Sequence, residues 1–333
     1  MNAAVLRTYD APPQYQEFDE PRSTDSHVVV EVETAGLNHF DLLKASGTHF
    51  SGPPPLPSVV GSDGVGRLPD GRRVFFDAIR APYGSMAERA LVPRDAVCEV
   101  AEGADSAVAA ALGNTGLTAW LALEWRARLA PGETVLVLGA TGAMGGAAVQ
   151  IARALGAGRV IAAALPDERL ARMRADAIVA FNDDEELAAG LRDVAPDGVD
   201  VIIDPLWGPP AVAAMGAARR DARHVSIGQM ASTTLTLPAP LVRSSALNIM
   251  GFAIFYAPLA VRRSAYLRLT ELAARSELDV DLEVLPLTEI ATAWARQGER
   301  RGGGAKLVMA CGGAGAASAE RPAARFERGR VQR

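Results

Sequence analysis

The stretch that decides the fold is Glu133-Thr134-Val135-Leu136-Val137-Leu138-Gly139-Ala140-Thr141-Gly142-Ala143-Met144-Gly145-Gly146. Its first half is a short apolar run rich in valine and leucine, which is typical of a strand buried on both faces of a parallel sheet. A glycine turn follows at once. Small and apolar residues then recur at helical spacing from Ala147 to Ala152. The order strand, glycine turn and helix predicts a doubly wound α/β fold.

The glycine turn also predicts a ligand. Its spacing, Ala140-x-Gly142-x-x-Gly145, is the dinucleotide fingerprint with alanine in the first position. The backbone N–H groups and the positive dipole at the start of the helix suit a pyrophosphate. Gly142 would let the backbone approach the phosphates, and Gly145 would let helix and strand pack closely. With Ala143 and Met144 these residues form the predicted cofactor-binding turn; the alternative is a structural tight turn.

Bulk properties limit the class of protein. A chain of 333 residues suits two domains, and 49% apolar with 22% charged residues is typical of a soluble globular protein. A net charge of −5 argues against a general nucleic-acid surface. We find no apolar stretch long enough to span a membrane and no signal peptide at the N-terminus, so we expect a cytoplasmic protein. Cys98 and Cys311 are then expected to be free thiols.

The sequence pattern of the chain changes near residue 117. Before it the sequence is β-rich and punctuated by glycine and proline; after it, strand-like and helix-like segments alternate. Beyond the fingerprint strand, further strands of the parallel sheet are expected at 160–164, 177–180, 199–204, 224–228 and 247–252. Helices are expected at 117–129 and 260–274, and a last short strand at 306–309. From Cys311 onward large apolar residues are scarce, so 311–333 is expected to be a disordered tail.

Several further motifs follow one another in a fixed order. They are Ala35-Gly36-Leu37-Asn38-His39-Phe40-Asp41, Leu56-Pro57-Ser58-Val59-Val60-Gly61-Ser62-Asp63-Gly64, Gly84-Ser85-Met86-Ala87-Glu88, Gly116-Leu117-Thr118-Ala119-Trp120 and Ala305-Lys306-Leu307-Val308. Together with the glycine turn, they resemble the zinc-independent quinone oxidoreductases of the medium-chain dehydrogenase/reductase superfamily over residues 1–310.

The resemblance implies two domains around a cleft that holds a nicotinamide cofactor. A GroES-like β-rich catalytic domain would comprise 1–115 and 253–310, and a Rossmann domain would comprise 116–252. Relatives pair through the last strand of the Rossmann sheet, and an apolar edge at 247–255 would otherwise invite aggregation, so we expect a homodimer.

The zinc ligands of related alcohol dehydrogenases are missing from the pattern. Asn38 stands at the cysteine position, and the segment of the His-Glu pair reads Gly61-Ser62-Asp63. The chain also has no cluster of cysteines for a structural zinc site. We therefore expect no metal.

Cofactor preference is read from the end of the second strand, which carries no carboxylate. NAD-specific folds place an acidic residue there, about 20 residues after the glycine turn. Arg169 lies where similar enzymes bind the 2′-phosphate, so we expect NADPH. Alternatively Asp167 and Glu168 only begin a helix and Arg169 is merely exposed, or Asp167 turns towards the ribose and favours NADH.

The resemblance assigns four more cofactor contacts. Thr118 would contact the nicotinamide or a nearby phosphate, and Phe181 would flank the adenine. Gly228 would let a loop approach the cofactor, and Lys306 would close over it from the catalytic domain. Each has an ordinary alternative: Phe181 as a core residue, Gly228 as a turn glycine, Lys306 as a surface residue.

Catalysis requires stabilisation of the negative charge that grows on the acceptor oxygen. Asn38 can offer its amide, and His49, on a loop expected to line the cleft, can donate a hydrogen bond or a proton. Alternatively, Asn38 only caps a helix that begins near Phe40, and His49 lies in a solvated loop. The sequence thus predicts an NADPH-dependent, metal-free enzyme that reduces a small quinone or α,β-unsaturated carbonyl (enone). The alternatives are a cofactor-binding redox sensor or structural protein without turnover, and an alcohol dehydrogenase.

Overall fold

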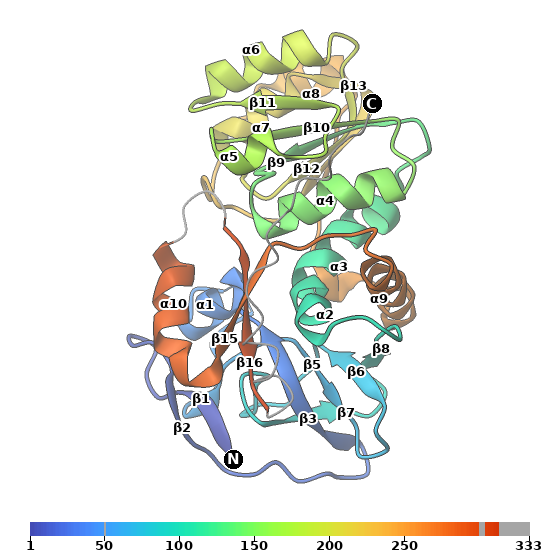
Figure 1. The fold of residues 1–333 in the computed structure, drawn as a ribbon. Coiled ribbons are helices and arrows are strands. Elements are labelled where there is room, and N and C mark those ends of the chain that lie inside the picture. Colours follow the sequence, from blue (N-terminus) through green and yellow to red (C-terminus); the bar gives the residue numbers. More distant parts are fainter. Residues whose placement is uncertain (50, 300–303, 313–333) are drawn as a thin grey trace.

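Two large sheets organise the chain, one in the upper half and one in the lower half of Figure 1. The computed structural model describes residues 1–49, 51–299 and 304–312. The upper sheet is parallel, with strand order β11-β10-β9-β12-β13-β14. Its strands are β9 (Thr134–Leu138), β10 (Arg159–Ala164), β11 (Ala177–Ala180), β12 (Val199–Asp204), β13 (Ala218–Ser226) and β14 (Asn248–Gly251).

The fingerprint strand β9 lies at the centre of this parallel sheet. Val135, Leu136, Val137 and Leu138 are fully buried, because β10 and β12 flank the strand and helices cover both faces of the sheet. The covering helices are α4 (Ala143–Ala154), α5 (Glu168–Ala171), α6 (Asp184–Val194), α7 (Gly208–Met215) and α8 (Ala239–Ser244). The predicted doubly wound sheet is confirmed.

The lower sheet is mostly antiparallel and combines both ends of the chain. Its order is β15-β16-β3-β5-β6-β8, with β7 paired to β3. These strands are β3 (His27–Gly36), β5 (Gly64–Arg67), β6 (Arg73–Phe76), β7 (Arg89–Pro93), β8 (Val97–Glu99), β15 (Leu282–Pro286) and β16 (Lys306–Ala310). A smaller sheet holds β1 (Asn2–Leu6), β2 (Gln14–Glu17) and β4 (Ser58–Val59).

The remaining helices lie beside or between the sheets. They are α1 (His39–Ala45), α2 (Ser106–Leu112), α3 (Asn114–Leu121), α9 (Leu259–Ala274) and α10 (Ile290–Glu299), with 3₁₀ turns at Ile254–Tyr256 and Leu287–Glu289. The predicted helix 117–129 is wrong at both ends, since α3 begins at Asn114 and gives way to a π-helical turn over Ala122–Arg126. The predicted helix 260–274 is confirmed as α9 within one residue.

The expected tail lies mostly outside the described residues. Of that segment the structure describes only Cys311 and Gly312. Cys311 is buried, and its N–H donates to the carbonyl oxygen of Glu33 at 3.0 Å, so the chain is still packed at this point.

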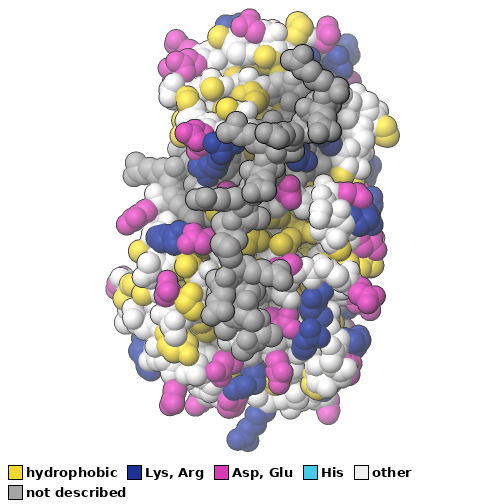
Figure 2. Space-filling view, in the orientation of Figure 1, with side chains coloured by type: hydrophobic (Ala, Val, Ile, Leu, Met, Phe, Trp, Pro, Cys, Tyr) yellow, Lys and Arg dark blue, Asp and Glu magenta, His cyan; other side chains and the backbone are white. Residues whose placement is uncertain are grey.

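Charged side chains of both signs are interspersed over the face drawn in Figure 2. Within the described ranges, no single helix has both the length and the apolar composition needed to cross a membrane. One bent pair, Ser106–Leu112 with Asn114–Arg126, meets these two criteria only when counted together.

Candidate active site

The glycine turn lies where an open α/β sheet usually binds its ligand. From β9 the chain winds outward through β10 and β11, and then resumes on the other side of β9 with β12. The point between β9 and β12 is therefore the switch point, and the crevice at the carboxyl ends of these strands is the expected binding place. Residues 139–142 follow β9 directly, and Gly142 is the N-cap of α4.

Close approach explains two of the glycines. A Cβ atom on Gly145 would lie 2.3 Å from the carbonyl oxygen of Gly139, so only glycine lets α4 pack this near the turn. A Cβ atom on Gly142 would lie 3.3 Å from the same oxygen, which a small shift relieves. Glycine at 142 therefore leaves open the space in front of the helix N-terminus, where the first N–H groups of α4 have no partner within the helix. Ala143 and Met144 are half-buried there, whereas Ala140 is fully buried.

A second loop, residues 205–208 after β12, lies next to the glycine turn. A Cβ atom on Gly139 would lie 3.3 Å from Cγ of Pro205 and 3.4 Å from Cδ2 of Leu206. One on Gly228, beyond β13, would lie 2.6 Å from the carbonyl oxygen of Pro205. Gly228 is thus required by backbone contact with the 205–208 loop.

Arg169 is oriented by its neighbour Asp167. The guanidinium donates to Asp167 from Nε at 3.1 Å and from Nη2 at 2.5 Å, while Asp167 also caps α5 by accepting the Arg169 N–H at 2.8 Å. Contact with Arg169 lowers the pKa of Asp167. Within the described part of the chain Nη1 makes no hydrogen bond, so the pair presents one edge of the guanidinium to a further anion.

Two other predicted cofactor residues differ in their surroundings. Thr118 lies half-buried on α3, the helix that packs against α4. Phe181 is only 5% exposed and belongs to a core cluster with Val179 and Leu187, which is the placement of an ordinary core residue.

Asn38 and Lys306, which are 268 positions apart, meet in a buried cluster between β3, β16 and α1. Lys306 Nζ donates to the carbonyl oxygen of Leu37 at 2.9 Å and to Oδ1 of Asn38. Asn38 Nδ2 donates to Oδ1 of Asp63 at 2.6 Å, and the Asn38 N–H donates to Oδ2 of Asp41 at 2.8 Å. Asn38 is both the N-cap of α1 and the centre of this network.

The two amide hydrogens of Asn38 are held unequally. One has the short bond to Asp63, whereas the remaining contacts of Nδ2 are long, 3.3 Å to the carbonyl oxygen of Gly36 and 3.4 Å to Oγ of Ser62. Bonds at such lengths are weak, so the second hydrogen is the one that this residue can offer to another acceptor.

Asp63 connects this cluster to the helix of Thr118. Its Oδ2 accepts the N–H of Asn114, the first residue of α3, at 2.9 Å. Burial raises the pKa of Asp63 to about 7, although the Lys306 ammonium acts in the opposite direction. Burial also raises the pKa of Asp41. The cluster is therefore a low-dielectric site with one cation and two carboxyl groups that resist ionisation.

His49 lies on the loop that follows α1. Its Nδ1 accepts the N–H of Ser51 at 3.2 Å, and its ring meets that of Phe40 edge-on at 4.7 Å. Partial burial lowers the pKa of His49. Nδ1 also lies 2.8 Å from Oγ of Ser51, in a contact whose donor depends on the tautomer of the ring.

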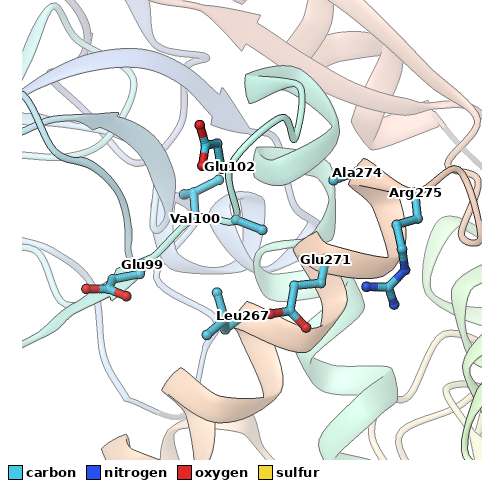
Figure 3. Close-up of a pocket in the computed structure, with 8 residues that line it drawn as sticks. Glu99, Val100, Glu102, Leu267, Glu271, Ala274 and Arg275 are labelled. Atoms are coloured by element: carbon cyan, nitrogen blue, oxygen red, sulfur yellow. The ribbon is translucent and has the colours of Figure 1, made fainter.

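A surface pocket of about 330 Å³ lies elsewhere, between the β8–α2 connection and α9 (Figure 3). It is lined by Glu99, Val100, Ala101, Glu102, Leu267, Glu271, Ala274 and Arg275. None of these residues belongs to the glycine turn or to the cluster around Asn38.

The sequence motifs singled out neither Asp63 nor a second buried pair, Asp204 and His224, whose side chains lie 2.8 Å apart. Asp63 stands in a quoted motif, but only the fold shows that it bonds both Asn38 and Asn114. A signal for the second pair was present: Asp204 ends one apolar strand, and His224 interrupts the next.

Comparisons with known proteins agree with this architecture. The family model described as zinc-binding dehydrogenase matches residues 143–275. The chain is 30% identical over 262 residues to quinone oxidoreductase-like protein 2 of Rattus norvegicus, covering 75% of this chain and 74% of the relative. It is 27% identical to a probable NADPH-dependent quinone reductase of Emericella nidulans, covering 88% of this chain and 96% of the relative.

A solved structure gives the same result. The quinone oxidoreductase of Thermus thermophilus, described with its NADPH complex, is 32% identical; the match has a TM-score of 0.77 and covers 93% of this chain and 100% of that one. The fold and site thus define a medium-chain dehydrogenase/reductase with Rossmann and GroES-like domains. Within that superfamily the chain belongs to the quinone oxidoreductase family and is an oxidoreductase.

Proposed function

We propose that the protein is an NADPH-dependent, metal-free reductase of small quinones or enones. The observation that carries most weight is the glycine turn at the N-terminus of α4. A Cβ atom on Gly142 would have only one neighbour, at 3.3 Å, so space is left for a ligand there, whereas Gly145 packs directly against the backbone of Gly139. A pyrophosphate at this turn would accept hydrogen bonds from the first N–H groups of the helix and meet its positive dipole end.

Arg169 supports the preference for NADPH. A 2′-phosphate near the end of β10 would meet the edge of the guanidinium that Asp167 leaves available. Such a charge-assisted contact contributes about 1.5–3 kcal/mol. The probable NADPH-dependent reductase of Emericella nidulans and the NADPH complex of the Thermus enzyme point the same way.

The residues at the zinc position of alcohol dehydrogenases do not suit that metal. Asn38 Oδ1 accepts a hydrogen bond from the Lys306 ammonium, and a cation beside this oxygen would repel Zn²⁺. Ser62 offers a hydroxyl rather than the thiolate, imidazole or carboxylate that zinc selects. Among the described residues, no group of three or more His, Cys, Asp or Glu side chains is placed to hold a metal.

Without a metal, hydrogen-bond donors must stabilise the negative charge that develops on the acceptor oxygen. When bound, NADPH would supply a hydride to the acceptor, and the electron pair displaced onto the acceptor oxygen needs a donor. In our proposal Asn38 turns its weakly held second amide hydrogen to that oxygen, while the short bond to Asp63 and the contact from Lys306 hold the amide in place. His49 Nε2 is the second candidate donor, on the loop after α1.

The two cysteines do not suit a thiol-based redox sensor. Burial raises the pKa of Cys98 and of Cys311 to about 12, which disfavours the thiolate that oxidants attack. A cofactor-binding protein without turnover remains the competing function, and it differs from our proposal in one measurable quantity, the steady consumption of NADPH.

The test is a panel of quinones and enones, each assayed with NADPH and with NADH by loss of nicotinamide absorbance. We expect turnover with NADPH, and a preference over NADH that shrinks in Arg169→Ala. Tighter binding of NADH by the unmodified protein would reject the cofactor assignment. Binding without turnover of any acceptor would favour the competing function.

We also propose a two-fold homodimer through β14. This strand is the edge of the parallel sheet, and Ile249 on it is 40% exposed. Beyond it Phe255 and Tyr256 are 46% and 65% exposed. An apolar edge of this kind is a template for pairing, here with a second copy of the chain. Sedimentation should show a dimer at micromolar concentration and a monomer for Ile249→Lys; an unmodified monomer would contradict this assignment.

A further inference from the structure

Asp204 and His224 form a fully buried pair in the parallel sheet. His224 Nε2 lies 2.8 Å from Oδ2 of Asp204, and both residues are 0% exposed. Where Asp204 is ionised it only accepts hydrogen bonds, so His224 Nε2–H is then the donor. His224 Nδ1 has no hydrogen-bond partner among the described residues.

The second carboxylate oxygen of Asp204 holds the loop that follows β12. It accepts the N–H groups of Leu206 at 2.8 Å and of Trp207 at 2.9 Å. Trp207 has φ 59° and ψ −173°, a backbone conformation that is strained for any residue with a side chain. Its ring lies edge-on to the His224 imidazole at 6.0 Å. The buried pair therefore contacts both the backbone and the side chain of the strained residue.

This loop lies between the two segments predicted to contact the cofactor. On one side Pro205 and Leu206 lie beside Gly139 of the glycine turn, where a Cβ atom would meet them at 3.3 and 3.4 Å. On the other side, their carbonyl oxygens accept the N–H groups of Met230 at 3.1 Å and of Ala231 at 2.8 Å, just beyond Gly228. A shift of 205–208 would move both segments.

We propose that Asp204 and His224 are positioning residues that clamp the 205–208 loop, with Trp207 in its strained conformation, and thereby shape the dinucleotide site. The inference deepens the proposed function and rests on dinucleotide binding by this protein. Neither residue needs to touch the cofactor. Backbone strain that persists beside a ligand site is sustained by the surrounding structure, and here the buried pair supplies that support.

The test compares His224→Phe with the unmodified protein by calorimetric titration with NADPH. Phenylalanine keeps an aromatic ring of similar size and removes the donor to Asp204. We expect affinity to fall about tenfold or more, because a hydrogen bond to a charged group is lost. The kcat at saturating NADPH should stay near that of the unmodified enzyme, while the KM for NADPH rises. Asp204→Asn, which keeps an acceptor for the loop, should lose less affinity than Asp204→Ala.

Thr270→Val is the matched control. Thr270 is also fully buried, and its hydroxyl accepts the Ala101 N–H at 3.1 Å, but on α9. It should lower the thermal midpoint without changing NADPH affinity. If His224→Phe fails to fold, Trp207→Ala at a half-buried position serves as the test, with the same rise in KM expected.

Two results are decisive. Unchanged NADPH affinity in folded His224→Phe, or an equal loss in Thr270→Val, would overturn the clamp and leave the proposed function standing. Failure of the unmodified protein to bind NADPH or NADH would overturn both.

Discussion

The proposed cofactor half of the candidate site is built mainly from backbone, and the proposed catalytic half from side chains. At the glycine turn, the distinguishing property is missing volume, since Gly145 and Gly228 allow main chain to meet main chain. Around Asn38, hydrogen bonds join its side-chain amide to the buried Lys306 ammonium and to the Asp63 carboxyl group, and its N–H to the carboxyl group of Asp41. The first arrangement depends on these glycines, because a Cβ atom would lie 2.3 Å from a carbonyl oxygen at Gly145 and 2.6 Å from one at Gly228. The second depends on every partner, since an unpaired buried polar group is costly.

The largest expected effect falls on the backbone half. Gly142→Val should weaken NADPH binding at least about 100-fold, since a side chain there fills the place of the pyrophosphate. The fold should survive, because the nearest contact of a Cβ atom at 142 is 3.3 Å. Calorimetry with circular dichroism would check both points.

Gly146→Ala is the control for that substitution. A Cβ atom at 146 meets only ordinary contacts, 3.6 Å to Ala140 O and to Met173 Cε, so NADPH should bind normally. Normal binding by Gly142→Val would show that the turn has been misplaced.

The next effect falls on the side-chain half. Asn38→Ala should slow enone reduction about 10–100-fold and quinone reduction less, because a reactive quinone needs less help from one hydrogen-bond donor. Steady-state kinetics would measure both rates. Ser62→Ala, which removes a hydroxyl that lies 3.4 Å from Asn38 Nδ2 and 3.2 Å from Asp63 Oδ1, should change little. Equal, unimpaired rates with both acceptors in Asn38→Ala would reduce Asn38 to a helix cap.

Asp63, in the side-chain half, should make the free energy of unfolding depend on pH. Burial raises its pKa from 3.8 to about 7, so between these values the folded state keeps a proton that the unfolded state releases. Stability contributed by this group therefore falls as pH rises through that window. From pH 5 to pH 8 the unmodified protein should lose roughly 2–3 kcal/mol relative to Asp63→Asn. Urea unfolding of both proteins would show it; a constant difference would mean that Asp63 is ionised throughout.

The smallest effect concerns Trp207. Glycine accepts a backbone near φ 59°, ψ −173° without strain, whereas alanine does not. Trp207→Gly should therefore be about 1 kcal/mol more stable than Trp207→Ala, although glycine loses more entropy on folding. Paired denaturant titrations would detect this, and a less stable glycine variant would argue that the residue is not strained.

The same contrast explains what the sequence could predict. Strands β11 and β12 occur at the expected 177–180 and 199–204, because short buried runs with flanking polar residues are local signals. Strand β13 begins at Ala218 rather than at 224. Its first residues include the charged Arg219, Arg220 and Asp221, which interrupt the apolar pattern used to predict a buried strand. The fingerprint was readable because strand, turn and helix are contiguous.

The hydrogen-bond network around Asn38 could not be predicted from a contiguous stretch of sequence. Asn38 and Lys306 were each singled out, but their contact joins positions 268 apart. The burial of Asp63 and its bond to Asn114 arise only when β5 and α3 pack together. Tertiary contacts of this kind leave no periodic pattern in the sequence.

The most direct test of the central claim is an anaerobic reaction of NADPH with a 1,4-benzoquinone, followed to completion with and without a zinc chelator. Transfer of one hydride with uptake of one proton converts the quinone to its hydroquinone and NADPH to NADP⁺. We predict one hydroquinone formed per NADPH consumed, at a rate that the chelator leaves unchanged. No consumption of NADPH, or a rate that the chelator abolishes and added zinc restores, would contradict it.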